Sequence, residues 1–217
     1  MEFSTACSLC PRLATFLKEV REAQPDYHAA PVPSFGDAAA RLLVVGLAPG
    51  MHGANRTGRP FTGDYAGNLL YSTLHRFGFS SRAEPLNVAG WANPELTLTD
   101  CRITNAVRCL PPQNKPEPSE VKQCNFYLAN ELAGLPQGAA ILALGTVAHQ
   151  AILRALELRI KEYGFGHGAQ HLLPNGMMLY DSYHCSRYNT QTKRLNEAMF
   201  HEVFSVISKY LSALEPA

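Results

Sequence analysis

The sequence has no apolar run long enough to cross a membrane. Its longest, Leu42–Pro49, is interrupted by Gly46 and is far shorter than the ~20 residues that a transmembrane helix requires. The beginning of the chain carries Glu2 and Arg12 and offers no uninterrupted apolar stretch that could act as a signal peptide. We therefore expect no membrane association and a cytoplasmic location.

The chain also has no excess of charge of one sign. It contains 19 Lys and Arg against 18 Asp and Glu, a formal net charge of +1. This balance neither requires nor excludes nucleic acid as a partner, because phosphate binding depends on local clusters of Lys and Arg. With 217 residues and 46% apolar content, the chain can bury one substantial core but not two ordinary enzyme domains. We expect residues 1–217 to form a single domain.

The signatures of the common nucleotide-binding folds are missing as well. Residues 46–64 contain five glycines and two prolines, but they lack the lysine and the spacing of a phosphate-binding P-loop, and Gly-x-Gly-x-x-Gly is absent. So many glycines are costly in a plain connector, but they let backbone amides approach a ligand closely. This loop is therefore expected to form a binding site for something other than a nucleotide cofactor.

What the sequence does contain is an alternation of strand-like and helix-like segments. Short apolar runs indicate buried strands, and longer stretches with helical spacing lie between them. This order predicts an α/β fold of three layers, α/β/α, with a central parallel sheet of about four strands. Residues 25–37 and 80–99 are expected to be surface loops. The predicted strands are 42–47, 102–107, 139–145 and 177–181, and the predicted helices are 10–24, 65–77, 117–133, 146–157 and 195–213.

Three segments with distinctive chemistry follow predicted strands, namely 46–63, 108–118 and 183–192. In open parallel sheets, ligands bind beyond the carboxyl ends of the strands. We therefore expect these three segments to meet at one edge of the sheet and to form the functional site there.

Six cysteines do not suit a disulfide framework in a cytoplasmic protein, which leaves metal ligation and buried apolar roles. Four thiolates, from a Cys-x-x-Cys pair and from two further positions across a Pro-rich turn, could bind either zinc or a 4Fe-4S cluster. We interpret Cys101 and Cys185 as ordinary buried or partly buried thiols. The four candidate ligands are Cys7, Cys10, Cys109 and Cys124.

Four other side chains near the expected site each allow two interpretations. Phe61 is either part of the core or a ring that stacks on a planar ligand. Asp64 precedes a predicted helix and suits an N-cap, but it could instead orient a water molecule. Asn105 and His184 are either satisfied groups near strand ends or hydrogen-bonding groups for a ligand.

The first glycine-rich loop resembles a known motif. It reads Gly-Leu-Ala-Pro-Gly at 46–50 and reaches Phe61 after ten further residues. This pattern resembles the first motif of the uracil-DNA glycosylase superfamily, and its continuation to Asp64 resembles family 5 of that superfamily. The resemblance implies a pocket for a flipped base, on which Phe61 stacks. The substrate-binding residues that it implies are Gly46, Leu47, Ala48, Pro49, Gly50, His52, Asn55 and Phe61.

At one position of this motif the chain differs from other branches of the superfamily. They carry Asp or Asn where this chain has Ala48, and an alanine cannot polarise a water molecule. Catalysis must then depend on other groups. Asp64 is one candidate for orienting the water, and the family 5 resemblance implicates Asn105. An alanine at position 48 is also compatible with a roomier pocket that accepts more than one base.

A second segment reads Tyr-His-Cys-Ser-Arg-Tyr-Asn at 183–189 and resembles the second motif of the same family, with Cys185 in place of the usual proline. The resemblance implies that His184 donates to a uracil carbonyl while the following loop enters the minor groove. Tyr188 is then either a wedge that replaces the extruded base in the stack or an ordinary exposed tyrosine on a polar loop. The DNA-binding residues expected here are Ser186, Arg187, Tyr188, Asn189, Lys193 and Arg194.

The cysteine pattern is also similar to that of families 4 and 5, which favours a 4Fe-4S cluster over zinc. Together the three matches imply a monofunctional, monomeric glycosylase that flips uracil, or another deaminated base such as hypoxanthine, out of DNA and hydrolyses the N-glycosidic bond. In a prokaryote such an enzyme would associate with the nucleoid. The alternative is a catalytically silent iron-sulfur protein of the same fold that binds DNA or senses redox state.

Overall fold

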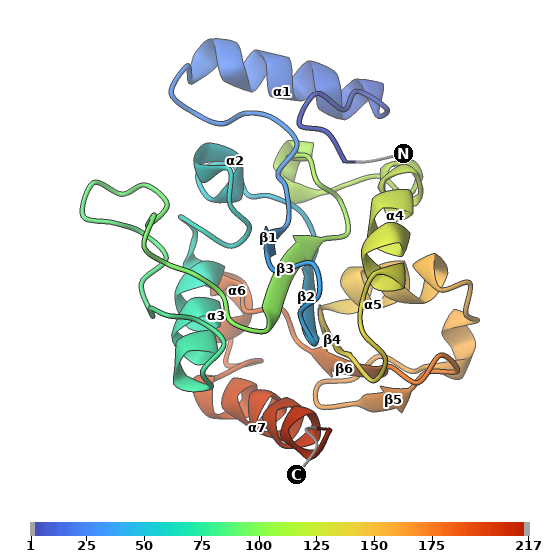
Figure 1. Cartoon of the computed structure of the whole chain (residues 1–217). Helices are drawn as coiled ribbons and strands as arrows, with labels where there is room; N and C mark the ends of the chain where they lie inside the picture. Colours follow the sequence, from blue (N-terminus) through green and yellow to red (C-terminus); the bar gives the residue numbers. More distant parts are fainter. Residues whose placement is uncertain (1–2, 215–217) are drawn as a thin grey trace.

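A six-stranded sheet, in the order β1-β3-β2-β4-β6-β5, forms the centre of the computed structural model, which describes residues 3–214 (Figure 1). Its four central strands are parallel, as the sequence predicted, and two antiparallel strands flank them. The central strands are β2 (Leu42–Gly46), β3 (Cys101–Asn105), β4 (Ala140–Leu144) and β6 (Met178–Ser182), and the edges are β1 (Phe35–Gly36) and β5 (Gln170–Leu172).

The prediction that 25–37 is a surface loop was wrong for part of that segment. It contains the edge strand β1, and both Ala29 and Val32 are fully buried. The backbone amides of these two residues donate to Asn55 and Arg108, so the segment is held between the first glycine-rich loop and the residues after β3. A two-residue strand has no alternating pattern that a sequence could reveal.

The central strands bury both of their faces. Leu43 and Val45 of β2 belong to one apolar core, and Leu42 and Val44 belong to the other. Because successive side chains of a strand point to opposite faces, an uninterrupted apolar run requires helices on both sides of the sheet. This confirms the three-layer architecture.

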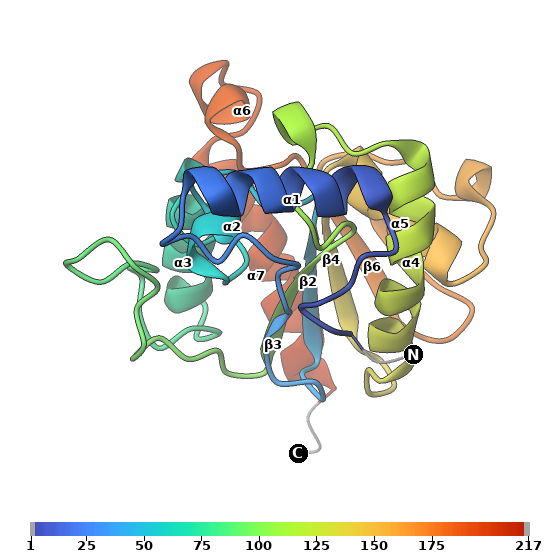
Figure 2. The ribbon, with the colours of Figure 1, turned by 90° about the horizontal axis from the view of Figure 1, so that it is seen from above.

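The five long helices lie within three residues of their predicted bounds. Helices α4 and α5 cover one face of the sheet together with α1, while α3 and α7 cover the other (Figures 1 and 2). None of the helices in residues 3–214 is long and apolar enough to span a lipid bilayer. The long helices are α1 (Pro11–Ala23), α3 (Tyr65–Arg76), α4 (Pro118–Ala133), α5 (Thr146–Ala155) and α7 (Glu197–Ala213), and the short ones are α2 (Ala54–Thr57), α6 (Arg187–Gln191), η1 (Pro112–Asn114) and η2 (Ile160–Glu162).

Candidate active site

The carboxyl ends of three parallel strands bring the distinctive segments together. Gly46 at the end of β2 pairs with Asn105 at the end of β3, and Ser182 ends β6 on the other side of β4. The amides of Ala106 and Val107 then donate to the carbonyls of Gly46 and Leu47, at 2.9 and 3.0 Å. The expectation of a shared edge is confirmed for the loops that follow these strands.

A buried pocket lies at this edge. Four of its lining side chains are the candidates Phe61, Asp64, Asn105 and His184, and the rest of its wall is formed by small residues. An open cleft of about 540 Å³, within the range typical of ligand sites, adjoins it and shares part of its lining. The shared lining residues are Ala48, Gly50, Asp64, Ala66 and His184.

Close packing around Phe61 explains the first glycine of the loop. A Cβ atom at Gly46 would lie 2.4 Å from Oδ1 of Asn105 and 2.6 Å from the Phe61 ring, so no side chain fits there. Phe61 itself has a left-handed backbone, with φ of 53°, which is costly for a residue other than glycine. The fold thus accepts strain in order to place this ring in the pocket.

Asp64 occupies the N-cap position of α3, but its side chain makes no hydrogen bond of capping geometry. Its Oδ1 is buried without a hydrogen-bond partner among the described residues, while Oδ2 lies against Gly53, where a Cβ would approach it to 2.1 Å. Burial raises the pKa of Asp64, and the backbone N–H of Gly67 offsets only part of this effect. The carboxylate lines the pocket, and its role in orienting a water molecule stays a prediction.

His184 is a neutral, half-buried imidazole that lines both the pocket and the adjoining cleft. Burial lowers its pKa to about 4, because the low-dielectric surroundings disfavour the imidazolium. Its ring stacks on Phe61 with centroids 5.8 Å apart and planes inclined by 27°. The Asn189 side chain donates to the backbone carbonyl of His184 at 2.8 Å. The histidine therefore sits against the predicted stacking ring.

The segment after His184 forms the short helix α6 rather than an open loop. Ser186, predicted to contact DNA, is the N-cap of α6, and the side chain of Asn189 is engaged with His184. Tyr188 is 70% exposed, as a wedge residue must be. Arg187 lies over the ring of Tyr65 in the cleft wall.

Of the remaining predicted residues in the two loops, some line the cleft and others lie away from it. Arg194 stacks over Tyr183 at 4.4 Å, and Lys193 is exposed with a left-handed backbone. His52 lines the cleft and its Nδ1 is 2.8 Å from the Tyr27 hydroxyl. Asn55 lines neither the pocket nor the cleft. Both polar atoms of its side-chain amide are buried and have no hydrogen-bond partner among the described residues.

Sequence reasoning missed five residues that line the cleft, namely Met51, Gly53, Tyr65, Ala66 and Asn114. Tyr65 supports Arg187, and Asn114 reaches the cleft from the Pro-rich segment after β3. Gln113 and Asn114 both have left-handed backbones, a conformation that concentrates at functional sites but leaves no mark in the sequence. Pro49, although predicted to bind substrate, does not line the pocket or the cleft.

The four candidate metal ligands converge, although about 100 residues of sequence separate Cys7 and Cys10 from Cys109 and Cys124. All four line one small cavity between α1, α4 and the residues after β3. Burial and the neighbouring Cys124 raise the pKa of the Cys10 thiol to about 11. A bound metal would reverse this effect by binding the thiolates. Cys101 and Cys185 are fully buried elsewhere, as predicted, and all six cysteines are free thiols.

Two of the four cysteine sulfurs accept hydrogen bonds, as the sulfur ligands of metal centres commonly do. The backbone N–H of Arg108 donates to Sγ of Cys124 at 3.3 Å, and the Tyr127 hydroxyl donates to Sγ of Cys7 at 3.5 Å. Such bonds are typical around iron-sulfur clusters, where they stabilise thiolate charge. Four sulfurs also suit zinc as a donor type, but no three of these four lie within 4.8 Å of one another, whereas the sulfurs of a tetrahedral zinc site lie about 3.8 Å apart.

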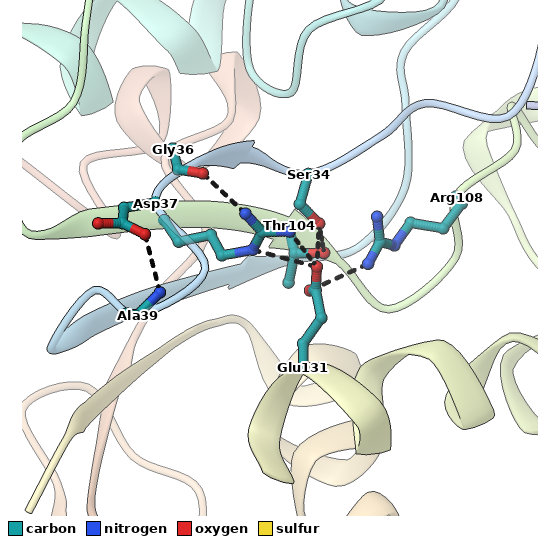
Figure 3. A network of polar contacts seen from close by, with 8 residues as sticks. Ser34, Gly36, Asp37, Ala39, Thr104, Arg108 and Glu131 are labelled. Atoms are coloured by element: carbon teal, nitrogen blue, oxygen red, sulfur yellow. Dashed lines mark hydrogen bonds and ion pairs between the residues drawn. The ribbon is translucent and has the colours of Figure 1, made fainter. Parts of the chain in front are cut away.

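A buried ionic network fixes the protein around this cavity. Glu131 of α4 pairs with Arg108 and Arg102 at 3.0 Å each, and it accepts from Ser34 (Figure 3). Burial alone would raise the pKa of Glu131, but Arg108 and its other partners lower it. Because Arg108 directly precedes Cys109, the network holds one cysteine segment against the helix that carries Cys124.

Comparison with known proteins identifies the family. Residues 33–207 match the family model of the uracil DNA glycosylase superfamily. The chain is 48% identical to a type-5 uracil-DNA glycosylase of Thermus thermophilus over 92% of this chain and 91% of that protein. It is 41% identical to one of Mycobacterium tuberculosis, over 94% and 78% of the two chains. A type-4 uracil-DNA glycosylase of Archaeoglobus fulgidus is 34% identical over 58% of this chain and 54% of that protein. The chain belongs to the uracil DNA glycosylase superfamily, in its type-5 branch.

Proposed function

We propose that this protein is a monofunctional DNA repair glycosylase that extrudes uracil from DNA and hydrolyses its N-glycosidic bond. The observation that carries the proposal is one buried pocket that combines an aromatic ring, a neutral histidine and a carboxylate beside an open cleft. An enzyme that reacts at the sugar–base bond must take the base out of the stack, and this pocket offers it an enclosed place. The relatives named type-5 uracil-DNA glycosylases support the same activity.

In this mechanism the pocket first holds the flipped base. The ring of Phe61 stacks on it, and the amide of Asn105 hydrogen-bonds its edge or the attacking water. Ala48 leaves space beside the base, which supports acceptance of hypoxanthine and other deaminated bases as well as uracil. The glycines at 46 and 50 allow the backbone to approach closely.

The chemical step then transfers a water molecule to C1′ of the sugar. As the C1′–N bond breaks, its electron pair passes to the base, and a ring N–H of His184 stabilises the negative charge that develops on a carbonyl oxygen. The sugar becomes oxocarbenium-like, and water attacks C1′ while the carboxylate of Asp64 accepts its proton. The products are an abasic site and a base that takes up a proton on release.

The DNA itself would lie along the cleft. Arg187, Lys193 and Arg194 are suited to phosphate contacts, and Tyr188 is suited to fill the space left by the extruded base. Within the protein, Ser186 caps α6 and the Asn189 side chain bonds to the His184 carbonyl. These roles are compatible with additional contacts to the DNA backbone. We further propose that residues 1–217 act as a monomeric single domain.

A gel assay of a duplex with one uracil tests the proposal. Incubation with the protein should produce an alkali-labile site at the uracil, and a matched duplex with thymine should remain intact. No cleavage after alkali, with duplex binding retained, would instead support the catalytically silent DNA-binding or redox-sensing alternative.

We also propose that Cys7, Cys10, Cys109 and Cys124 hold a 4Fe-4S cluster. When bound, the cluster would tie the N-terminal segment and α1 to α4 and to the residues after β3, contributing folding energy rather than chemistry at the base. The four converging thiols, the N–H of Arg108 on sulfur and the type-5 relatives support this assignment.

Purified protein is therefore expected to be brown and to contain about four iron and four sulfide per chain. Replacing Cys7 or Cys109 by alanine should remove the colour and lower the soluble yield, because the metal stabilises the fold. Cys101→Ala is the matched control, since this buried thiol lies outside the cavity and its loss should leave the iron content unchanged. Stoichiometric zinc without iron after anaerobic purification would contradict the cluster.

Phe61→Ala is expected to slow base removal by the loss of stacking. Base–aromatic contacts contribute about 1–3 kcal/mol, so the single-turnover rate or the affinity for the flipped state should fall roughly 5- to 150-fold. The control is Phe77→Ala, which removes a ring packed against α7 far from the pocket and should lower only stability. Unchanged activity in Phe61→Ala would mean that this ring serves only the core.

A further inference from the structure

A buried histidine–carboxylate pair lies behind the strand that leads to His184. His149 of α5 and Asp181 of β6 are both fully buried, and Nδ1 of the histidine lies 2.8 Å from Oδ1 of the aspartate. The other ring nitrogen, Nε2, lies 2.9 Å from the backbone carbonyl of Tyr163. The mechanism above uses none of these groups.

Both nitrogens of His149 face acceptors, and a neutral imidazole has only one N–H. Only the imidazolium can donate to both at once. Burial alone would lower the pKa of His149, but the hydrogen bond and charge of Asp181, with the Tyr163 carbonyl, outweigh burial and raise it. The pair is therefore an imidazolium–carboxylate ion pair with each donor satisfied.

His171 also approaches Asp181, so His149, His171 and Asp181 form a cluster that could hold a metal ion in place of the proton on His149. Two atoms bound to one zinc ion by bonds of ~2.0–2.1 Å would lie about 3.3 Å apart. The 2.8 Å separation between His149 and Asp181 is shorter and matches a hydrogen bond. The geometry thus favours a shared proton over a metal ion.

The pair fixes the loop formed by residues 163–169. Its backbone pairs with Asp181, since Gly168 donates to the Asp181 carbonyl at 2.9 Å and the Asp181 amide donates to Ala169 at 3.0 Å. His149 secures the beginning of the same loop through the carbonyl of Tyr163. The loop is thereby attached to both β6 and α5.

This 163–169 loop in turn holds the residue beside His184. Nδ1 of His167 accepts from the Tyr183 amide at 3.2 Å, and the two rings stack with centroids 5.1 Å apart. The N-terminus of α5 contacts the same segment, because Gly145 donates to the Ser182 carbonyl at 2.9 Å. A Cβ at Gly145 would lie 3.6 Å from Cβ of His184.

We propose that His149 is a positioning residue for His184, acting as an imidazolium that clamps α5 and the 163–169 loop to Asp181. The inference rests on the proposed glycosylase function for its kinetic consequences. Loss of the clamp lets α5 and the loop move relative to β6, and the ring of His184 moves with them. A donor displaced from the developing charge stabilises it less.

The clamp has a defined pH dependence. The groups that face His149 are Asp181 of β6, His171 of β5 and Tyr163 of the loop. Because the pKa of His149 is raised, the ion pair is complete at and below the usual titration range of histidine and is lost as the pH rises through the raised value. Wild-type catalysis should therefore decline on the alkaline side.

His149→Gln is the kinetic test. One amide cannot donate to both acceptors, so the single-turnover rate should fall about 10- to 100-fold, the cost of a misplaced catalytic group, with duplex affinity unchanged. The alkaline decline seen in the wild type should be absent. His201→Gln is the control: this histidine also faces a carboxylate, Glu197 at 3.7 Å, but lies on α7 away from the site, and its rate and pH profile should match the wild type.

A spectroscopic test does not depend on activity. In ¹⁵N-labelled holoprotein at neutral pH, both ring nitrogens of His149 should carry protons, identified by the signal that disappears in His149→Gln. A wild-type rate and pH profile in His149→Gln would overturn the proposal, as would a neutral ring or bound zinc at this cluster. If wild-type protein cleaves no uracil duplex yet His149 is doubly protonated, the glycosylase function fails while the ion pair remains.

Discussion

Replacing His184 by alanine is expected to slow base removal by about 10²- to 10³-fold, the usual cost of one donor that stabilises a developing negative charge. The ring is neutral because burial lowers its pKa to about 4. A neutral donor suffices, since charge appears on the base carbonyl only as the glycosidic bond breaks. The loss should therefore appear in the single-turnover rate, measured with enzyme in excess over a uracil-containing duplex.

Duplex affinity should change little in this variant, because phosphate contacts along the cleft dominate binding. The control is His75→Ala, which removes an exposed histidine on α3 and should leave both quantities unchanged. Weaker DNA binding together with a normal single-turnover rate would contradict the assignment and give His184 a role in binding the DNA backbone. No titration of His184 should appear near the ordinary pKa of histidine.

The sequence predicted the parallel core of the sheet because β2 and β4 are apolar runs and because strand-like and helix-like segments alternate along the chain. It missed β1 and β5, which lie at the sheet edges and have only two and three residues, too few for a periodic signal in the sequence. It also placed 25–37 on the surface, although Ala29 and Val32 pack inside. Small apolar residues among prolines give no periodic signal, so tertiary packing alone decides their burial.

At the site, residues next to one another in a motif were easier to predict than residues joined by the fold. The pocket brings together Phe61, Asn105 and His184 as the resemblance implied. In contrast, His149 and Asp181 lie 32 residues apart on a helix and a strand, and no local pattern connects them. For Asp64, the position before a helix suggested a cap, but the side chain makes no capping hydrogen bond; it lies against Gly50 and Gly53 and lines the pocket.

Asp64→Asn is expected to lower the single-turnover rate by about 10²- to 10⁴-fold, the range for loss of a general base. The amide has nearly the same shape but cannot take a proton from water. Only the carboxylate form of Asp64 is active, and burial raises the pKa of Asp64. As the pH is lowered, the wild-type rate should therefore begin to fall at a higher pH than it would with an ordinary carboxyl group. A normal rate in this variant would assign the water to another group.

In Asp64→Asn the stability of the protein should rise while the rate of base removal falls. A raised pKa means that the folded state favours protonated Asp64, and this contribution to stability is lost as the pH rises through the raised value. At neutral pH the buried carboxylate therefore destabilises the fold, and Asp64→Asn should raise the thermal midpoint. Asn196→Ala is the control for a true N-cap, because its side chain accepts from Met199 at 2.9 Å, and it should lower stability by about 1 kcal/mol with a normal rate. If Asp64→Ala lowers the stability of the protein as much as Asn196→Ala does, Asp64 acts as a helix cap. If Asp64→Asn is instead slower in base removal and more stable than the wild type, the fold tolerates a buried charge at this position because catalysis requires it.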